Sequence, residues 1–220
     1  MIEKNILEFL KDIKKNNYKP WFDSNKKRYE DARSSFILSV EKMIAAIATF
    51  DNEISNLTAK ECILRINRDV RFSKNKTPYK NNMAAYFNRA GKKGTGAGYY
   101  LHIEPGASFA AAGIWMPEGD GLSKIRQEID YNFDEWKKII GSSAFKKQFE
   151  KGLESSNTLV RPPKGYDENN PAINFLKLKS FIVSKTFSDA DVMSKTFTSD
   201  LTKTFRQVKP MIDFINRSLD

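Results

Sequence analysis

The sequence predicts an α+β fold: a mostly antiparallel central sheet with N-terminal helices and C-terminal helices packed against it. Three observations predict this fold. Apolar residues recur at helical spacing near both ends of the chain. From Glu61 to Met116 the apolar period shortens towards two, which is the spacing of strands. Within that region Pro105-Gly106 separates two apolar runs and indicates a hairpin. Nothing resembles a long linker, so one domain over residues 1–220 is expected.

Two helices are expected before the sheet. The first covers residues 2–13, where five apolar side chains share one face, and Pro20 follows its end. The second is capped by Asp23 or Ser24 and continues to about Phe50 along one apolar stripe.

The sheet is expected to begin near Cys62. Apolar and polar residues alternate from there to Phe72, but Arg68 falls on the apolar face, which favours a break or bulge at that point. A loop over residues 73–80 leads to a second strand at 83–87.

The hairpin strands cover residues 99–104 and 108–116. Alternation directs Tyr99, Leu101 and Ile103 to the core, and the next three side chains to the opposite face: Tyr100, His102 and Glu104. The run of small residues at 110–113 allows a close approach by a helix or a ligand.

After the hairpin the pattern predicts helices at 122–132, 133–140 and 143–150, a short helix from Pro171 to Leu176, and a final strand at 181–187. Asp189 and Ser199-Asp200 suggest caps for terminal helices.

Composition limits the class of protein. One cysteine excludes an intramolecular disulfide framework, and the first residues lack the pattern of a signal peptide. No apolar run is long enough for a membrane helix, so no membrane partner and a cytoplasmic location are expected.

Most of the net charge lies in one short segment. Of the total of +10, residues 65–93 carry +8, with nine basic side chains and a single acidic one, Asp69. This concentration favours a local anion site over a general basic bias. The candidate ligands for the anion are Arg65, Arg68, Arg71, Lys74, Lys76 and Lys80, with Arg161 on the stiff Pro162-Pro163 segment as a further wall.

Three residues are candidates for orientation or proton transfer. Asp69 is suited to orienting an arginine, to acting as a general base, or to serving as a metal carboxylate. Tyr79 lies in the basic segment, and His102 is the only histidine, which favours a hydrogen-bonded structural role or acid–base work over a metal site.

No cofactor is expected. The run Gly91 to Gly98 lacks the spacing of a phosphate-binding loop and leads into a strand rather than a helix. A basic loop between strands is the simpler interpretation.

Several separate motifs carry a resemblance over essentially the whole chain. They are W-F at Trp21-Phe22, R-D-V-R-F-S-K-N-K-T-P-Y-K at residues 68–80, G-Y-Y-L-H-I-E-P-G at 98–106, W-M-P at 115–117, R-P-P-K-G-Y at 161–166 and L-K-L-K-S-F at 176–181. In this the chain resembles the uncharacterised family catalogued as domain of unknown function 2461. The resemblance implies one full-length domain but no reaction. The family pattern has Asp where Asn75 stands, so a role that needs a carboxylate at this position is not implied here.

The sequence therefore predicts a protein that binds a compact anionic, phosphate-bearing small molecule through residues 65–80, and it leaves open whether a reaction follows. Two alternatives remain. Aromatic residues near the basic segment fit a nucleic-acid-binding domain, although no known nucleic-acid motif is present. The segment also fits a structural or protein-interaction module with a solvated basic edge.

Overall fold

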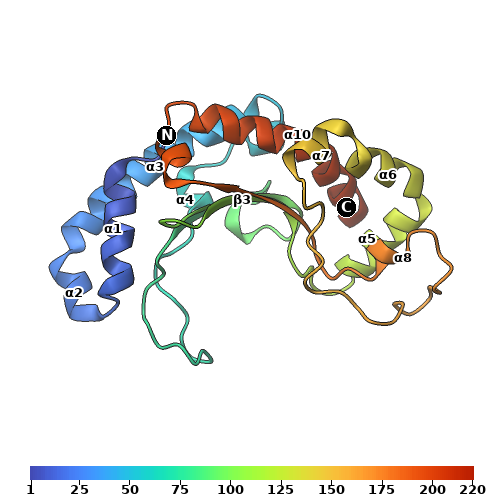
Figure 1. Cartoon of the computed structure of the whole chain (residues 1–220), viewed down its shortest axis with the longest axis horizontal. Coiled ribbons are helices and arrows are strands. Elements are labelled where there is room, and N and C mark those ends of the chain that lie inside the picture. Colours follow the sequence, from blue (N-terminus) through green and yellow to red (C-terminus); the bar gives the residue numbers. More distant parts are fainter. The chain divides into compact units, whose positions relative to one another are not determined.

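The computed structural model describes all 220 residues, in two compact units (Figure 1). The first unit contains Met1–Lys93, Tyr100–Ala110 and Thr186–Lys203, and the second contains Gly94–Tyr99, Ala111–Lys185 and Thr204–Asp220. The fold class is α+β, as predicted. The single domain expected over residues 1–220 stays a prediction.

The sheet has four antiparallel strands in the order β1-β2-β3-β4. The bounds are Met83–Phe87 for β1, Gly98–Ile103 for β2, Ser108–Ile114 for β3 and Phe181–Phe187 for β4. The strands predicted after residue 82 are therefore confirmed, and so are the two faces of β2: Tyr99, Leu101 and Ile103 are buried, whereas Tyr100 and His102 are half-buried.

The small residues of β3 allow the backbone of the neighbouring strand β4 to approach closely. Gly113 has a φ of 127°, and a Cβ atom added there would lie 1.9 Å from the carbonyl oxygen of Phe181 in β4. Only glycine combines this backbone conformation with this contact.

The first three helices of the first unit meet at the aromatic ring of Phe9. This ring lies in α1 and contacts Trp21 and Phe22 of α2 and Tyr29 of α3, with centroid distances of 5.7 to 6.4 Å. The helices are α1 (Lys4–Lys15), α2 (Lys19–Ser24), α3 (Lys26–Ala48), α4 (Ala59–Cys62), α9 (Asp189–Met193) and the short 3-10 turns η1 (Asn52–Ile54) and η2 (Gly91–Lys93). Helix α2 was not predicted: Pro20 lies in its first turn, and Asn25, not Asp23 or Ser24, is the N-cap residue of α3.

The second unit has Trp136 at its centre, with its ring within 6.1 Å of Phe175, Phe181 and Phe214. Its helices are α5 (Gly121–Tyr131), α6 (Phe133–Gly141), α7 (Ser143–Gln148), α8 (Ile173–Leu176) and most of α10 (Phe197–Leu219), close to their predicted positions. The side-chain amide of Asn216 accepts the N–H of Ala97 at 2.7 Å and donates to its carbonyl at 3.3 Å.

The strand predicted from Cys62 to Phe72 is wrong. Cys62 ends helix α4, where a capping box between Thr58 and Glu61 favours a helical turn. Beyond it only two isolated bridges form, Ile63 with Ala85 and Asn67 with Tyr79. No helix of the structure is long and apolar enough to cross a membrane.

Candidate functional site

Residues 63–82 form a long loop, here called the basic loop, and its base, residues 63–68 and 78–82, is attached to the rest of the first unit. It is the loop between α4 and β1 that extends away from the strands in Figure 1. Two backbone hydrogen bonds join the two sides of the loop: Lys80 N–H donates to the Ile66 carbonyl at 2.8 Å, and Arg68 N–H donates to the Pro78 carbonyl at 2.9 Å. A third joins its base to β1: Leu64 N–H donates to the Ala84 carbonyl at 2.9 Å. The side-chain amide of Asn17 pairs with both backbone groups of Tyr79.

The alternation read from the sequence holds for exposure, although no strand forms. Arg65, Asn67 and Asp69 are exposed, whereas Ile66 is buried and Arg68 is half-buried. Backbone pairing between the two sides of the loop ends at Pro78, because proline has no N–H to donate. Side chains also donate to the backbone carbonyls that would continue the pairing. Arg68 donates to the carbonyl of Thr77 at 3.1 Å, and Lys76 donates to that of Val70 at 3.0 Å.

The far end of the loop, residues 69–76, is here called the loop tip. Asp69 holds Arg71 through two hydrogen bonds, Nε to Oδ1 at 3.0 Å and Nη2 to Oδ2 at 2.7 Å. These bonds lower the pKa of the Asp69 carboxyl. Phe72 was expected on the apolar face of a strand, but its side chain is 97% exposed. Phe72 therefore does not lie on the apolar face of a strand as the alternation predicted, because the segment leaves the sheet before this residue.

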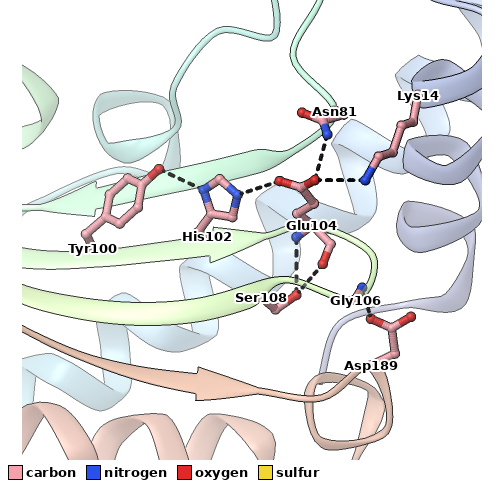
Figure 2. A network of polar contacts seen from close by, with 8 residues as sticks. All are labelled: Lys14, Asn81, Tyr100, His102, Glu104, Gly106, Ser108 and Asp189. Carbon is pink, nitrogen blue, oxygen red and sulfur yellow. Dashed lines mark hydrogen bonds and ion pairs between the residues drawn. The ribbon is translucent and has the colours of Figure 1, made fainter. Parts of the chain in front are cut away.

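A chain of polar contacts crosses one face of β2 (Figure 2). The Tyr100 hydroxyl lies 3.1 Å from Nδ1 of His102, and Nε2 of His102 lies 3.2 Å from Oε2 of Glu104. The other oxygen of Glu104 accepts from Asn81 at 2.6 Å and from Lys14 at 3.3 Å. An ionised carboxylate only accepts, so Nε2 carries the proton in the neutral imidazole and Nδ1 accepts from the Tyr100 hydroxyl.

Burial controls the protonation of His102 and Tyr100. His102 stacks on Phe109 with ring centroids 4.7 Å apart, and its side chain is 13% exposed. Burial lowers the pKa of the His102 imidazole; the contact with Glu104 opposes this and the charge of Lys80 adds to it. Burial also raises the pKa of the Tyr100 phenol. At neutral pH the imidazole is therefore uncharged and the phenol keeps its proton.

Lys80 brings a positive charge to this face. It is half-buried at the base of the loop and lies close enough to His102 to influence the imidazole. Burial lowers the pKa of the Lys80 ammonium, and the nearby Arg65 guanidinium lowers it further. The structure gives neither Arg65 nor Lys80 an ion pair.

The predicted site residues fall into three groups. At the base of the loop the charge of Arg65 acts on Lys80 and the charge of Lys80 acts on His102. A second group lies along the loop and at its tip: Arg68, Asp69, Arg71, Lys74 and Lys76. Arg161 is exposed and belongs to the second unit.

Tyr79 has a packing position. Its side chain is 6% exposed, and its ring stacks on Phe22 with centroids 4.1 Å apart and planes inclined by 15°. A role in proton transfer stays a prediction for Tyr79 and for Asp69.

Three partners of His102 and Glu104 were missed as site residues. Tyr100 shares the face of His102, so strand alternation could have found it. Lys14 and Asn81 reach Glu104 from 90 and 23 residues away in sequence, and no local pattern indicates such contacts. No group of three or more His, Cys, Asp or Glu side chains lies together in a way that could hold a metal ion.

A family model described as conserved hypothetical protein (DUF2461) matches residues 5–214. No curated protein and no solved structure matches the chain.

Proposed function

The chain belongs to the family of conserved hypothetical proteins DUF2461, whose description assigns no activity, and from this starting point we propose a function from the site itself. The protein binds a compact anionic, phosphate-bearing small molecule at the base of the loop. Arg65 and Lys80 hold the anion beside His102.

The observation that carries this proposal is the unpaired, half-buried cation Lys80. Partial burial removes water from its ammonium group, and Arg65 adds a second positive charge instead of a compensating carboxylate. Two neighbouring cations that lack a counter-ion repel each other. A phosphate group carries a charge of about −1.5 to −2 at neutral pH and would relieve this repulsion by binding between them.

The size of the cluster favours a small ligand. The cation whose charge acts on Lys80 is Arg65. Two cations suit one phosphate group better than a long polyanion.

The polar contacts on β2 provide a path along which a proton could move from a ligand through Tyr100 to His102. Both nitrogens of His102 are occupied, so the Tyr100 hydroxyl is the group through which a ligand would reach it. A ligand hydroxyl would give its proton to the Tyr100 oxygen while Tyr100 gives its own to Nδ1 of His102. The imidazolium that results would be stabilised by Glu104.

The test uses pyrophosphate as the probe at constant ionic strength. Binding at ten times the Kd stabilises the protein by about 1.4 kcal/mol, which raises Tm by about 3–6 °C for a chain of this size. Lys80→Gln and Arg65→Gln should lose this rise, and the control Lys74→Gln, which removes one cation at the loop tip, should keep it. If all three variants behave like the wild type, the loop base is not an anion site. If Lys74→Gln loses the rise as fully as Lys80→Gln, the binding reflects general charge and the proposed site is wrong.

A further inference from the structure

We propose that the loop tip, residues 69–76, binds single-stranded nucleic acid, with the Phe72 ring stacked on one base. This site uses different residues from the anion site at the loop base, so it goes beyond the proposed function and does not depend on it.

The first argument is the exposure of Phe72. Its side chain is 97% exposed, whereas most of the large aromatic side chains of this protein are buried or half-buried. Leaving an aromatic ring in water forgoes the stabilisation that burial of such a side chain provides. The Arg71 guanidinium lies over the ring, which leaves the other face open to a flat partner.

The second argument is that the loop tip is held in place around Phe72. Lys76 donates to the carbonyl of Val70, and the N–H of Ser73 donates to the same oxygen at 3.3 Å. The Arg68 guanidinium donates to the Ser73 hydroxyl at 3.3 Å. A loop backbone that is already held in place loses less conformational entropy when a partner binds to it.

The third argument is the charge around the ring. The guanidinium of Arg71 lies 5.9 Å from the centre of the Phe72 ring, and Lys74 and Lys76 follow within four residues. Asp69, the only carboxylate of the loop tip, is already paired with Arg71. Aromatic stacking platforms flanked by cations are what single-stranded nucleic acids bind, because every base has a flat face and every nucleotide has a phosphate.

The same features fit other anionic partners less well. In duplex DNA the bases are stacked on one another, so their faces are not open to Phe72. An anionic bilayer would gain only Phe72 and the half-buried Val70, and the other side chains of the loop tip are polar or charged. Such a tip has too little apolar surface for stable insertion.

The experiment measures fluorescence anisotropy of a labelled 12-nucleotide oligothymidine over a range of salt concentrations. With two or three phosphates neutralised, the slope of log affinity against log salt should be about −1.4 to −2.1. Phe72→Ala should weaken binding by about 5- to 150-fold with the slope unchanged. Lys74→Gln should make the slope about 0.7 shallower. Phe72→Trp should retain binding, and its fluorescence should be quenched by the oligonucleotide.

Val160→Ala is the matched control, because Val160 is 91% exposed in the second unit and should leave affinity unchanged. Folding is not at risk in Phe72→Ala, since the side chain has almost no buried surface. An affinity for oligothymidine that Phe72→Ala leaves within about twofold would overturn the proposal. So would binding that depends on Phe72 only with vesicles containing phosphatidylserine, which would assign the loop tip to a bilayer.

Discussion

The side-chain amide of Asn17 pairs with both backbone groups of Tyr79, which lies 62 residues later in the chain: the Asn17 amide donates to the Tyr79 carbonyl at 2.9 Å and its oxygen accepts the Tyr79 N–H at 3.0 Å. The contact attaches the base of the basic loop to the segment between α1 and α2. It therefore fixes the backbone directly before Lys80 and helps to position that cation beside His102.

Asn17→Ala should destabilise the protein and loosen the loop. The nearly buried backbone groups of Tyr79 would lose their partners, at a cost of about 1–3 kcal/mol. Urea unfolding measures the loss, and limited proteolysis should cut within residues 63–82 faster than in the wild type. Asn5→Ala removes only an exposed contact with Ser35 and should cost less than about 0.5 kcal/mol. Equal stability of the two variants would contradict a structural role for the Asn17 contact.

Gly113→Ala should be among the most damaging single substitutions. The added Cβ would lie 1.9 Å from the Phe181 carbonyl oxygen, and alanine would also have to adopt a φ of 127°. A loss of more than about 4 kcal/mol is expected in urea unfolding, or no folded protein at all. Gly141→Ala is the control, because no atom lies within 4 Å of the added Cβ in helix α6, and alanine there should stabilise by up to about 1 kcal/mol.

The stability should fall as the pH is lowered through the range where His102 titrates. The native pKa of His102 lies below its unfolded value of about 6.5, so the unfolded chain takes up the proton first. The contribution of neutral His102 is therefore complete above about pH 6.5 and is lost as the pH falls towards the native pKa. His102→Asn should show less loss of Tm between pH 7.5 and 5.5 than the wild type.

Because His102 is the only histidine, NMR can follow its imidazole without assignment. A midpoint below 6.5 is expected. A midpoint above 6.5 would mean that the Glu104 contact outweighs burial, and the sign of the pH dependence would reverse.

Lys80→Met should stabilise the folded protein while it removes anion binding. The substitution keeps the aliphatic stem and deletes a half-buried charge that has Arg65 beside it and no carboxylate partner. Because much of the side chain stays in water, the expected gain is small, on the order of 0.5 kcal/mol in urea unfolding. A loss of stability would indicate that the ammonium makes a favourable contact in the native state.

The sequence was most informative where one local pattern controlled the structure. The apolar runs of β1 and β4 predicted their bounds, and alternation along β2 placed Tyr100 and His102 on one face. Alternation also predicted which side chains are exposed near Arg65, because exposure depends on backbone direction and not on a complete ladder.

The errors arise where distant residues or single groups decide. The missing N–H of Pro78 and the side-chain bonds of Arg68 and Lys76 end the pairing that alternation suggested. Lys14, a partner of Glu104, and Asn17, a partner of Tyr79, lie far away in the sequence. The sequence could therefore predict candidate site residues but not the contacts that each of them makes.

The isolated bridge between Ile63 and Ala85 has a consequence for contacts between molecules. Strand β1 lies at one end of the sheet, and its run Met83-Ala84-Ala85-Tyr86-Phe87 contains neither a charge nor a proline. An open edge of this kind can accept a strand from a neighbouring copy and start aggregation. The bridge and the bond from Leu64 N–H to the Ala84 carbonyl cover part of that edge with the chain itself. Residues 63–64, at the base of the basic loop, thus protect the edge of the sheet against pairing with a strand of another molecule.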